Sequence, residues 1–443
     1  MKKIRIGGGA GYGGDRLEPA LKLLNEGNLD YIGFECLAER TIALAQKEKK
    51  NDPKKGYNHL LEYRMSAILP ILQEKRTKVI SNMGAANPVQ AMKVTQEIAR
   101  KMGIKGLKIA AVLGDDVLDT IRHSLHLPIL ETGKPLSTIG PQIISANAYI
   151  GVEGIVEALE KGADIILTGR VSDPSLFLAP MIYEFGWEMD DFEKLGKGTM
   201  IGHLLECAGQ VTGGYFADFN RKFIPDLWDL GFPFAEVEES GDGFISKVKG
   251  TGGLINTATC TEQLLYEIHD PAQYLTPDCI ADFSKVEFEA IAENCVRFSK
   301  ATGKKATDTY KVSVGYSNGY VGEGQISYGG HDCIARARLA GEIVKKRLER
   351  LPLQEVRMDI LGLNSISPME TEPEGLEEVR LRVCAKADTF EMARHIGQEV
   401  ETLYTNGPYG GGGVSQQVEE VISVASVLLP KSAVNIHVEY LNT

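Results

Sequence analysis

Residues able to bind an anion follow a strand-like run in the middle of the chain. The apolar run 165–167 is typical of a buried parallel strand, and it ends at Gly169-Arg170. In open α/β proteins, ligands bind just beyond the carboxyl ends of such strands. We therefore predict that Arg170 and Asp173 bind substrate, with the arginine as a fork for a carboxylate or phosphate. An internal ion pair would explain the same arginine, and a helix cap would explain Asp173, which precedes a proline.

A possible acid–base pair lies in the next segment. His203 and Glu206 are three residues apart in a stretch predicted to be helical, so their side chains share one face. We predict that they are catalytic, either moving protons or serving as two ligands of a metal completed elsewhere. Asp115 and Asp116, which follow another strand-like run, are predicted to be catalytic by the same chemistry. A histidine that is merely solvated or caps its helix would look the same in the sequence.

Glycine and polar residues follow five strand-like runs in the first half of the chain. Because the carboxyl ends of parallel strands meet at one edge of a sheet, we expect these residues to surround a single crevice. Each loop taken alone is equally consistent with an ordinary helix start, since Asp and Asn cap helices and Gly forms turns. Besides Arg170 and Asp173, the predicted substrate-binding residues are Gly11, Gly13, Gly14, Asp15, Glu35 and Asn82.

The first of these loops also matches a cofactor pattern. Gly9, Gly11 and Gly14 have the spacing of a dinucleotide fingerprint, and Glu35 at the end of the next strand would be its ribose-binding acid. A run this rich in glycine satisfies many glycine patterns, so we do not expect NAD or FAD. A nest for a phosphate or carboxylate is the alternative. The sequence leaves the cofactor unidentified, with a divalent metal as one candidate.

A parallel sheet is needed to position these residues, and the first half of the chain has the pattern of one. Strand-like runs alternate with helix-like segments, which predicts an α/β fold whose mainly parallel sheet is covered by helices in a large N-terminal domain, residues 1–351. The middle, about 190–332, carries short β-like runs such as 244–249 and 310–316, and we expect it to fold against this sheet. Predicted strands are 3–7, 31–34, 78–81, 107–113 and 164–167; predicted helices are 16–25, 37–49, 57–74, 88–101 and 149–160.

The last part of the chain has a different pattern. A charged helix is predicted over 333–350, and the Leu351-Pro352 that ends it is our domain boundary. Residues 352–443 are predicted to form a small α+β domain with a ferredoxin-like order of elements. The expected strands there are 356–360, 378–385 and 433–440, and the expected helices are 389–404 and 415–428.

Composition narrows the class of protein. The chain has 443 residues, a formal net charge of −12 and 43% hydrophobic residues. An acidic balance argues against a nucleic-acid or membrane-surface partner, because such proteins usually carry a basic face. No apolar run is long enough to span a bilayer, and the N-terminus lacks the apolar core of a secretory signal. The seven scattered cysteines form no C-x-x-C pair, which favours reduced thiols. We expect a cytoplasmic homo-oligomer with a small anionic substrate.

Several long motifs resemble the acyclic terpene utilisation protein A-like family. They include GGGAGYGGDR at the start, GRVSDPSLFLAP and HLLECAGQVTGGYFAD in the middle, and GPYGGGG near the end. The resemblance covers most of the chain and implies a large α/β N-terminal domain followed by a small ferredoxin-like domain. It also implies a link to the catabolism of branched acyclic acids or their coenzyme A thioesters. It assigns no catalytic residue.

These observations together predict an enzyme that acts on a small carboxylate or acyl-thioester by lyase, hydratase or hydrolase chemistry. Two alternatives stay open. One is a dinucleotide-dependent oxidoreductase, which the glycine pattern of the first loop would serve. The other is a non-catalytic subunit that binds the substrate for a catabolic enzyme complex.

Overall fold

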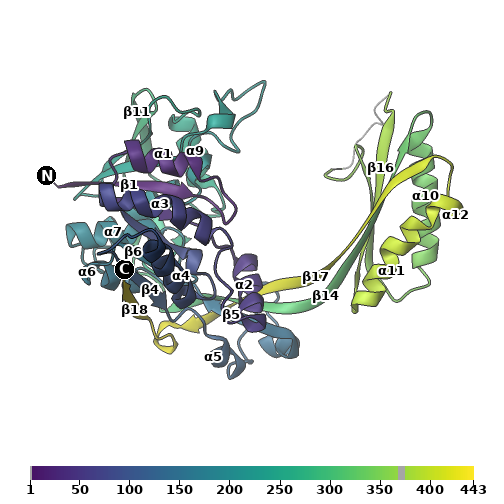
Figure 1. Ribbon diagram of the computed structural model, residues 1–443, viewed down its shortest axis with the longest axis horizontal. Helices are drawn as coiled ribbons and strands as arrows, with labels where there is room; N and C mark the ends of the chain where they lie inside the picture. Colours follow the sequence, from purple (N-terminus) through teal and green to yellow (C-terminus); the bar gives the residue numbers. More distant parts are fainter. Residues whose placement is uncertain (1, 368–374) are drawn as a thin grey trace. The chain divides into compact units, whose positions relative to one another are not determined.

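The chain folds into two compact units. A computed structural model describes residues 2–367 and 375–443 (Figure 1). The first unit contains the chain up to Gly315 and its last segment, Val424–Thr443, and the second unit is Tyr316–Ser423. The chain enters the second unit in the long strand β14 (Thr309–Gly329) and returns in the long strand β17 (Gly411–Pro430).

A ten-stranded sheet forms the centre of the first unit. Its five central strands, in the order β1-β2-β3-β6-β4, are parallel neighbours, which confirms the predicted α/β class. Antiparallel strands extend both edges: β7, β8, β12 and β11 beside β1, and β18 beside β4. The bounds are β1 Lys3–Ala10, β2 Tyr31–Phe34, β3 Lys78–Ser81, β4 Lys108–Leu113, β6 Ile165–Thr168, β7 Pro233–Glu238, β8 Gly243–Lys247, β11 Glu287–Ala292, β12 Cys295–Ser299 and β18 His437–Asn442.

Helices cover both faces of this sheet. Side chains alternate between the two faces along a strand. Ile32 and Phe34 of β2 belong to the core that includes residues of α1, α3 and α4, whereas Gly33 between them faces Phe177 of α7. The central strands are therefore buried on both sides and are almost continuously apolar. The helices are α1 Glu18–Glu26, α2 Glu39–Asn51, α3 Leu61–Lys75, α4 Pro88–Lys101, α5 Leu118–Arg122, α6 Glu153–Glu160, α7 Ser175–Phe185, α8 Phe192–Glu206 and α9 Thr257–Leu265.

The middle of the chain folds against the first sheet, as expected. Four of its strands extend the edge next to β1. Another three, β9 (Tyr274–Leu275), β10 (Ile280–Asp282) and β13 (Thr302–Lys304), form a small separate sheet that contacts α8. Strand β5 (Ile143–Ala148) pairs with β14. Among these additions, β7, β10 and β13 contact α8, the helix that carries His203 and Glu206.

The second unit has its own sheet and its own core. Its strands follow the order β15-β16-β14-β17, and helices α10 and α11 both pack on β16. Buried residues such as Ile326, Leu381 and Ile396 form its core. A closer likeness to the ferredoxin fold stays a prediction. The remaining bounds are β15 Gln354–Leu361, β16 Glu378–Ala387, α10 Cys333–Leu348, α11 Phe390–Glu401 and α12 Leu403–Asn406.

The helix predicted over residues 415–428 is wrong, because this segment lies inside β17. Its valines and isoleucine have a spacing that also suits a helix. β-branched side chains fit a pleated sheet better, however, and the segment pairs with β14. That partner is about a hundred residues away in the sequence. When the pairing partner of a strand is so distant, the residues near the strand in the sequence give little indication that it is a strand.

The compact units also divide the chain differently from the expected boundary at Leu351-Pro352. The proline follows the end of α10, but α10 packs on β15 and β16, so both sides of the proline belong to the second unit. The last strand, expected in the C-terminal domain, is β18, and it pairs with β4 in the first unit. The first unit therefore contains both ends of the chain.

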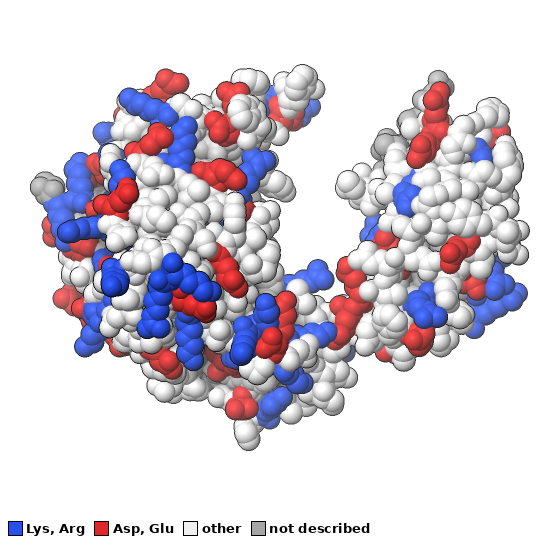
Figure 2. Space-filling view, viewed as in Figure 1, with Lys and Arg blue, Asp and Glu red and all other residues white. Residues whose placement is uncertain are grey.

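Charged side chains of both signs are spread over the surface. Figure 2 shows Lys and Arg interspersed with Asp and Glu on the visible face. Within the described parts of the chain, no helix is both long enough and apolar enough to cross a bilayer.

Candidate active site

The carboxyl ends of the five parallel strands lie side by side, but the polar residues there bind mainly to one another. Glu35 Oε1 accepts hydrogen bonds from Asn82 Nδ2 at 2.9 Å and from the backbone N–H of Leu37 at 2.8 Å. Asn82 Oδ1 in turn accepts from the backbone N–H of Cys36 at 2.6 Å. Glu35 and Asn82 are both buried. This pair therefore ties the end of β2 to the end of β3.

Arg170 is held by protein acceptors. Its guanidinium donates to the carbonyls of Leu37 and Val171 and to the carboxylate of Asp173, and lies over the ring of Tyr149 at 4.4 Å. Its side chain is only 1% exposed, and four of its five N–H groups are used in this way. The internal ion pair that the sequence left as an alternative is present. Substrate binding by Arg170 and Asp173 stays a prediction.

Asp115 and Asp116 lie at the end of β4. Asp115 Oδ2 accepts from Asn147 Nδ2 at 2.8 Å and from the backbone N–H of Arg170 at 2.9 Å. Burial raises the pKa of Asp115 to about 6. Asp116 accepts from Gln46 Nε2 at 2.9 Å. The two carboxylates line a cavity of about 430 Å³ beside the start of α4.

The glycine loop between β1 and α1 binds one of its own carboxylates. Asp15 accepts hydrogen bonds from the backbone N–H groups of Gly11 and Arg16, both at 2.8 Å. Strand β1 continues to Ala10 and α1 begins only at Glu18, so the glycines precede the helix rather than open it. A Cβ on Gly13 would lie 3.0 Å from the carbonyl of Cys36, and one on Gly14 would lie 3.0 Å from the ring of Tyr12. A side chain at either position would require its neighbours to shift by a few tenths of an ångström, so both glycines pack closely within the chain.

His203 and Glu206 form a hydrogen-bonded pair in the last turn of α8. The distance from His203 Nδ1 to Glu206 Oε1 is 2.6 Å, and the side chains are 2% and 10% exposed. The imidazole packs against the rings of Tyr274 and Phe283. Burial would lower the pKa of His203, but the carboxylate of Glu206 raises it above its ordinary value. Burial raises the pKa of Glu206. The pair therefore holds a proton more firmly than a free imidazole.

Four buried polar atoms around the end of α8 have no hydrogen-bond partner in the described ranges. They are His203 Nε2, Glu206 Oε2, Gln210 Oε1 and Gln263 Oε1. Gln263 is tied to the pair because its Nε2 donates to the carbonyl of His203 at 2.9 Å. Such atoms are costly when buried alone, which makes them available to a ligand. Neither glutamine carries a sequence signal that would have pointed to this site.

The His203–Glu206 pair belongs to the same charged cluster as the strand ends. Burial and then the charge of Asp173 raise the pKa of Glu35 to about 8. The same Asp173 carboxylate also raises the pKa of Glu206, in addition to the effect of burial. The three carboxyl groups are therefore within electrostatic reach of one another. Arg170 opposes this effect, since its charge lowers the pKa of Glu35.

A cavity of about 350 Å³ opens beside this cluster. Its walls come from the glycine loop, from Cys207 and Gln210 just after α8, and from Leu227, Leu230 and Phe232. Arg16 lies at its exposed edge, donates to the carbonyl of Trp228 at 3.1 Å and forms no ion pair within the described ranges. The cavity therefore combines an apolar wall with one available cation. Sequence reasoning missed Arg16.

The alternative role of His203 and Glu206, as two ligands of a metal ion, requires at least one further ligand. Within residues 2–367 and 375–443, no group of three or more His, Cys, Asp or Glu side chains is arranged to hold a metal ion. Cys207, next to Glu206, has a pKa raised by burial and by that carboxylate, so its thiol keeps its proton. A protonated thiol is a poor nucleophile.

Fold and site together define an α/β protein with a candidate acid–base centre beside a small, partly apolar cavity. The model of the acyclic terpene utilisation family protein AtuA matches residues 4–440. Because the match covers nearly the whole chain, the protein belongs to this family, and the resemblance seen in the sequence motifs is confirmed. Neither the curated proteins nor the solved structures contain a significant match to it.

Proposed function

We propose that this protein is an enzyme of acyclic terpene catabolism that moves a proton on a small branched carboxylate or its acyl-thioester. The observation that carries the proposal is the buried His203–Glu206 pair, joined at 2.6 Å and with Nε2 and Oε2 unpartnered within the described ranges. Family membership supports the class of pathway. The apolar wall of the adjacent cavity suits a branched hydrocarbon chain.

Each member of the pair has a distinct role in this proposal. We assign the proton between them to Nδ1 of His203, with Glu206 as its acceptor, so Nε2 is the nitrogen that would exchange a proton with a substrate. The carboxylate of Glu206 raises the pKa of His203 despite burial, so we assign Nε2 the role of an acid that becomes a base after giving up its proton. Arg16 at the edge of the cavity would bind the substrate carboxylate.

The geometry favours lyase or hydratase chemistry over hydrolysis through a covalent intermediate. Cys207 is held as a thiol by burial, which raises its pKa. Ser175 donates its hydroxyl proton to Asp278. Cys207 is thus not activated as a nucleophile, and Ser175, although Asp278 could accept its proton, is not among the residues that line the cavity beside Cys207. Proton transfer by the His–Glu pair needs no nucleophile from the protein.

The test is proton exchange between solvent and substrate. The intact protein is incubated in D₂O with branched acyclic carboxylates and with their coenzyme A thioesters, and deuterium uptake or water addition is followed by mass spectrometry and NMR. His203→Gln and Glu206→Gln each remove one member of the pair, and each should lower the rate of deuterium uptake or water addition roughly 100-fold or more. Arg16→Gln should raise KM with little change in kcat. The exposed His123→Gln is the matched control.

Other outcomes would point elsewhere. Substrate binding without any exchange or turnover would favour the binding-subunit alternative. Reduction of added NAD would favour an oxidoreductase. Unchanged rates in folded Glu206→Gln and His203→Gln variants would overturn the proposal.

A further inference from the structure

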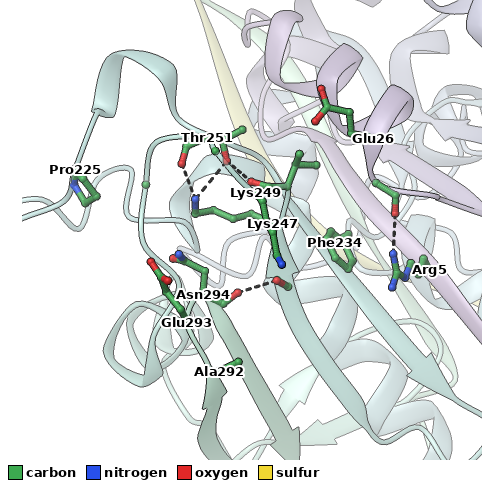
Figure 3. Close-up of a pocket in the computed structure, with 15 residues that line it drawn as sticks. Arg5, Glu26, Pro225, Phe234, Lys247, Lys249, Thr251, Ala292, Glu293 and Asn294 are labelled. Carbon is green, nitrogen blue, oxygen red and sulfur yellow. Dashed lines mark hydrogen bonds between the residues drawn. The ribbon is translucent and has the colours of Figure 1, made fainter.

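A second, larger cavity lies away from the His203–Glu206 pair. It has a volume of about 900 Å³ and shares no lining residue with the cavity beside Cys207. Figure 3 shows its walls, which include Arg5 of β1, Phe234 of β7 and the turn that follows β8. Lys247 and Lys249 lie on either side of Val248 at the start of this turn.

Lys247 is an unusual residue for such a position. It is only 7% exposed, and its ammonium donates to the carbonyl of Thr251 at 2.7 Å and to the hydroxyl of Thr251 at 3.3 Å. Within the described parts of the chain it has no carboxylate close enough for an ion pair. Lysines are almost never buried without such a partner. An ammonium has three N–H donors, so one stays available here.

The charges around Lys247 are arranged by depth. Arg5 is partly buried and is paired with Glu236 at 2.8 Å, while Lys249 is exposed at the edge of the cavity. The two acidic residues in the wall, Glu26 and Glu293, are both exposed, so water screens them. Burial lowers the pKa of Lys247, whereas among the nearby charges Glu293 raises it, Lys22 lowers it and Asp229 raises it. The most buried charged side chain in the wall of the cavity is therefore a cation, in a protein of net charge −12.

We propose that this cavity binds the phosphate group of a small ligand, with Lys247 as its inner contact and Lys249 as its outer one. A buried ammonium without a counter-ion is costly, and a bound anion removes that cost. A doubly charged phosphate suits the site because it can accept hydrogen bonds from both lysines at once. The ligand has access through the exposed edge that Lys249 marks.

The experiment measures phosphate binding by the full-length protein. Inorganic phosphate and pyrophosphate are titrated at constant ionic strength, with chloride as the reference anion, by calorimetry and by ³¹P NMR line broadening. Lys247→Met should weaken binding about tenfold or more, which is the effect expected from losing a charge-assisted hydrogen bond. Lys285→Met, on an exposed surface outside the cavity, should bind as the wild type does.

A second measurement covers the case in which Lys247→Met does not fold. The wild-type protein is treated with a limiting amount of an amine-reactive acetylating reagent, with and without phosphate. The acetylated lysines are then identified by peptide mass spectrometry. Phosphate should protect Lys247 and Lys249 several-fold while leaving Lys285 unchanged. Equal modification with and without phosphate, or unchanged affinity in a folded Lys247→Met variant, would overturn the proposal. Acetate that binds as tightly as phosphate would show that the site takes carboxylates instead.

Discussion

Among single residues, Glu35 shows how burial sets the chemistry of this site. Its carboxyl group is within electrostatic reach of Arg170 and Asp173 and accepts a hydrogen bond from Asn82. Burial and the neighbouring Asp173 raise its pKa from 4.5 to about 8. At neutral pH the folded protein therefore keeps this proton, whereas the unfolded chain has lost it. A raised pKa of this kind makes the fold more stable at low pH and less stable as pH rises toward 8.

This gives a prediction for the pH dependence of stability. In Glu35→Gln, which keeps the acceptor for Leu37 and Asn82, the free energy of unfolding should fall less between pH 5 and pH 8.5 than in the wild type. The difference should be roughly 2–5 kcal/mol, since each pKa unit corresponds to about 1.4 kcal/mol. Urea unfolding at several pH values measures it. Glu48→Gln, at an exposed position, is the control and should show the same change in the free energy of unfolding with pH as the wild type. If Glu35→Gln also shows that change, Glu35 is ionised in the folded protein.

Arg170 carries the second prediction at this scale. Arg170→Ala leaves a carboxylate and two carbonyls without their donor, so it should lower the free energy of unfolding by about 3–5 kcal/mol. Arg170→Lys should lose less, because an ammonium can keep part of the contact but cannot form the fork. Denaturant unfolding measures both, with the exposed Arg100→Ala as control. A stable Arg170→Ala variant with a raised KM would instead support the predicted role in substrate binding.

Among the elements, the contact between β1 and α8 connects the sheet to the His203–Glu206 pair. A Cβ built on Gly8 of β1 would lie 2.5 Å from the carbonyl oxygen of Leu205, in the same helical turn as the pair. That distance is too short for real atoms, and the obstructing atom is backbone. The end of α8 therefore stays in place only because position 8 has no side chain.

Gly8→Ala should accordingly disturb both stability and activity. The end of α8 must shift, at a cost of about 1–3 kcal/mol in the free energy of unfolding, which is typical of overpacking. The rate of proton exchange should fall as well, because His203 and Glu206 move with the helix. Thermal unfolding and the exchange assay measure the two effects. Gly140→Ala is the control, since a Cβ there would meet only ordinary contacts at 3.4 Å.

At the scale of the whole molecule, the two units have separate hydrophobic cores. The core of the first unit includes Leu167 of β6, and the core of the second includes Leu381 of β16. Neither cluster contains a residue of the other unit. Each unit therefore has its own source of hydrophobic stability, and we expect them to unfold in separate steps.

Matched core substitutions test this expectation. Leu167→Ala and Leu381→Ala each remove a buried leucine and should cost about 2–5 kcal/mol in the unit that carries them. Scanning calorimetry of the intact protein should show two transitions, and each substitution should lower only one of them. A single transition that both substitutions shift equally would mean that the two units unfold cooperatively.

Features set by neighbouring residues were accessible from the sequence. Strands 31–34 and 78–81 and the helix 88–101 have the bounds observed for β2, β3 and α4. The spacing of His203 and Glu206 places them on one helical face, where they are indeed bonded. Such features depend on side-chain periodicity and on caps, which act over a few residues.

Tertiary structure alone decided the rest, because the partners involved are far apart along the chain. Residues 415–428 form a strand rather than a helix because β14 pairs with them, and the last strand lies in the first unit because β4 offers it a free edge. The polar residues at the strand ends form hydrogen bonds with one another, and their binding of a substrate stays a prediction. The unpartnered Oε1 of Gln263 and the burial of Lys247 become visible only when the fold shows how the described residues contact one another. Burial is a property of the assembled chain, and it sets both the pKa values and the cavities on which the proposed functions rest.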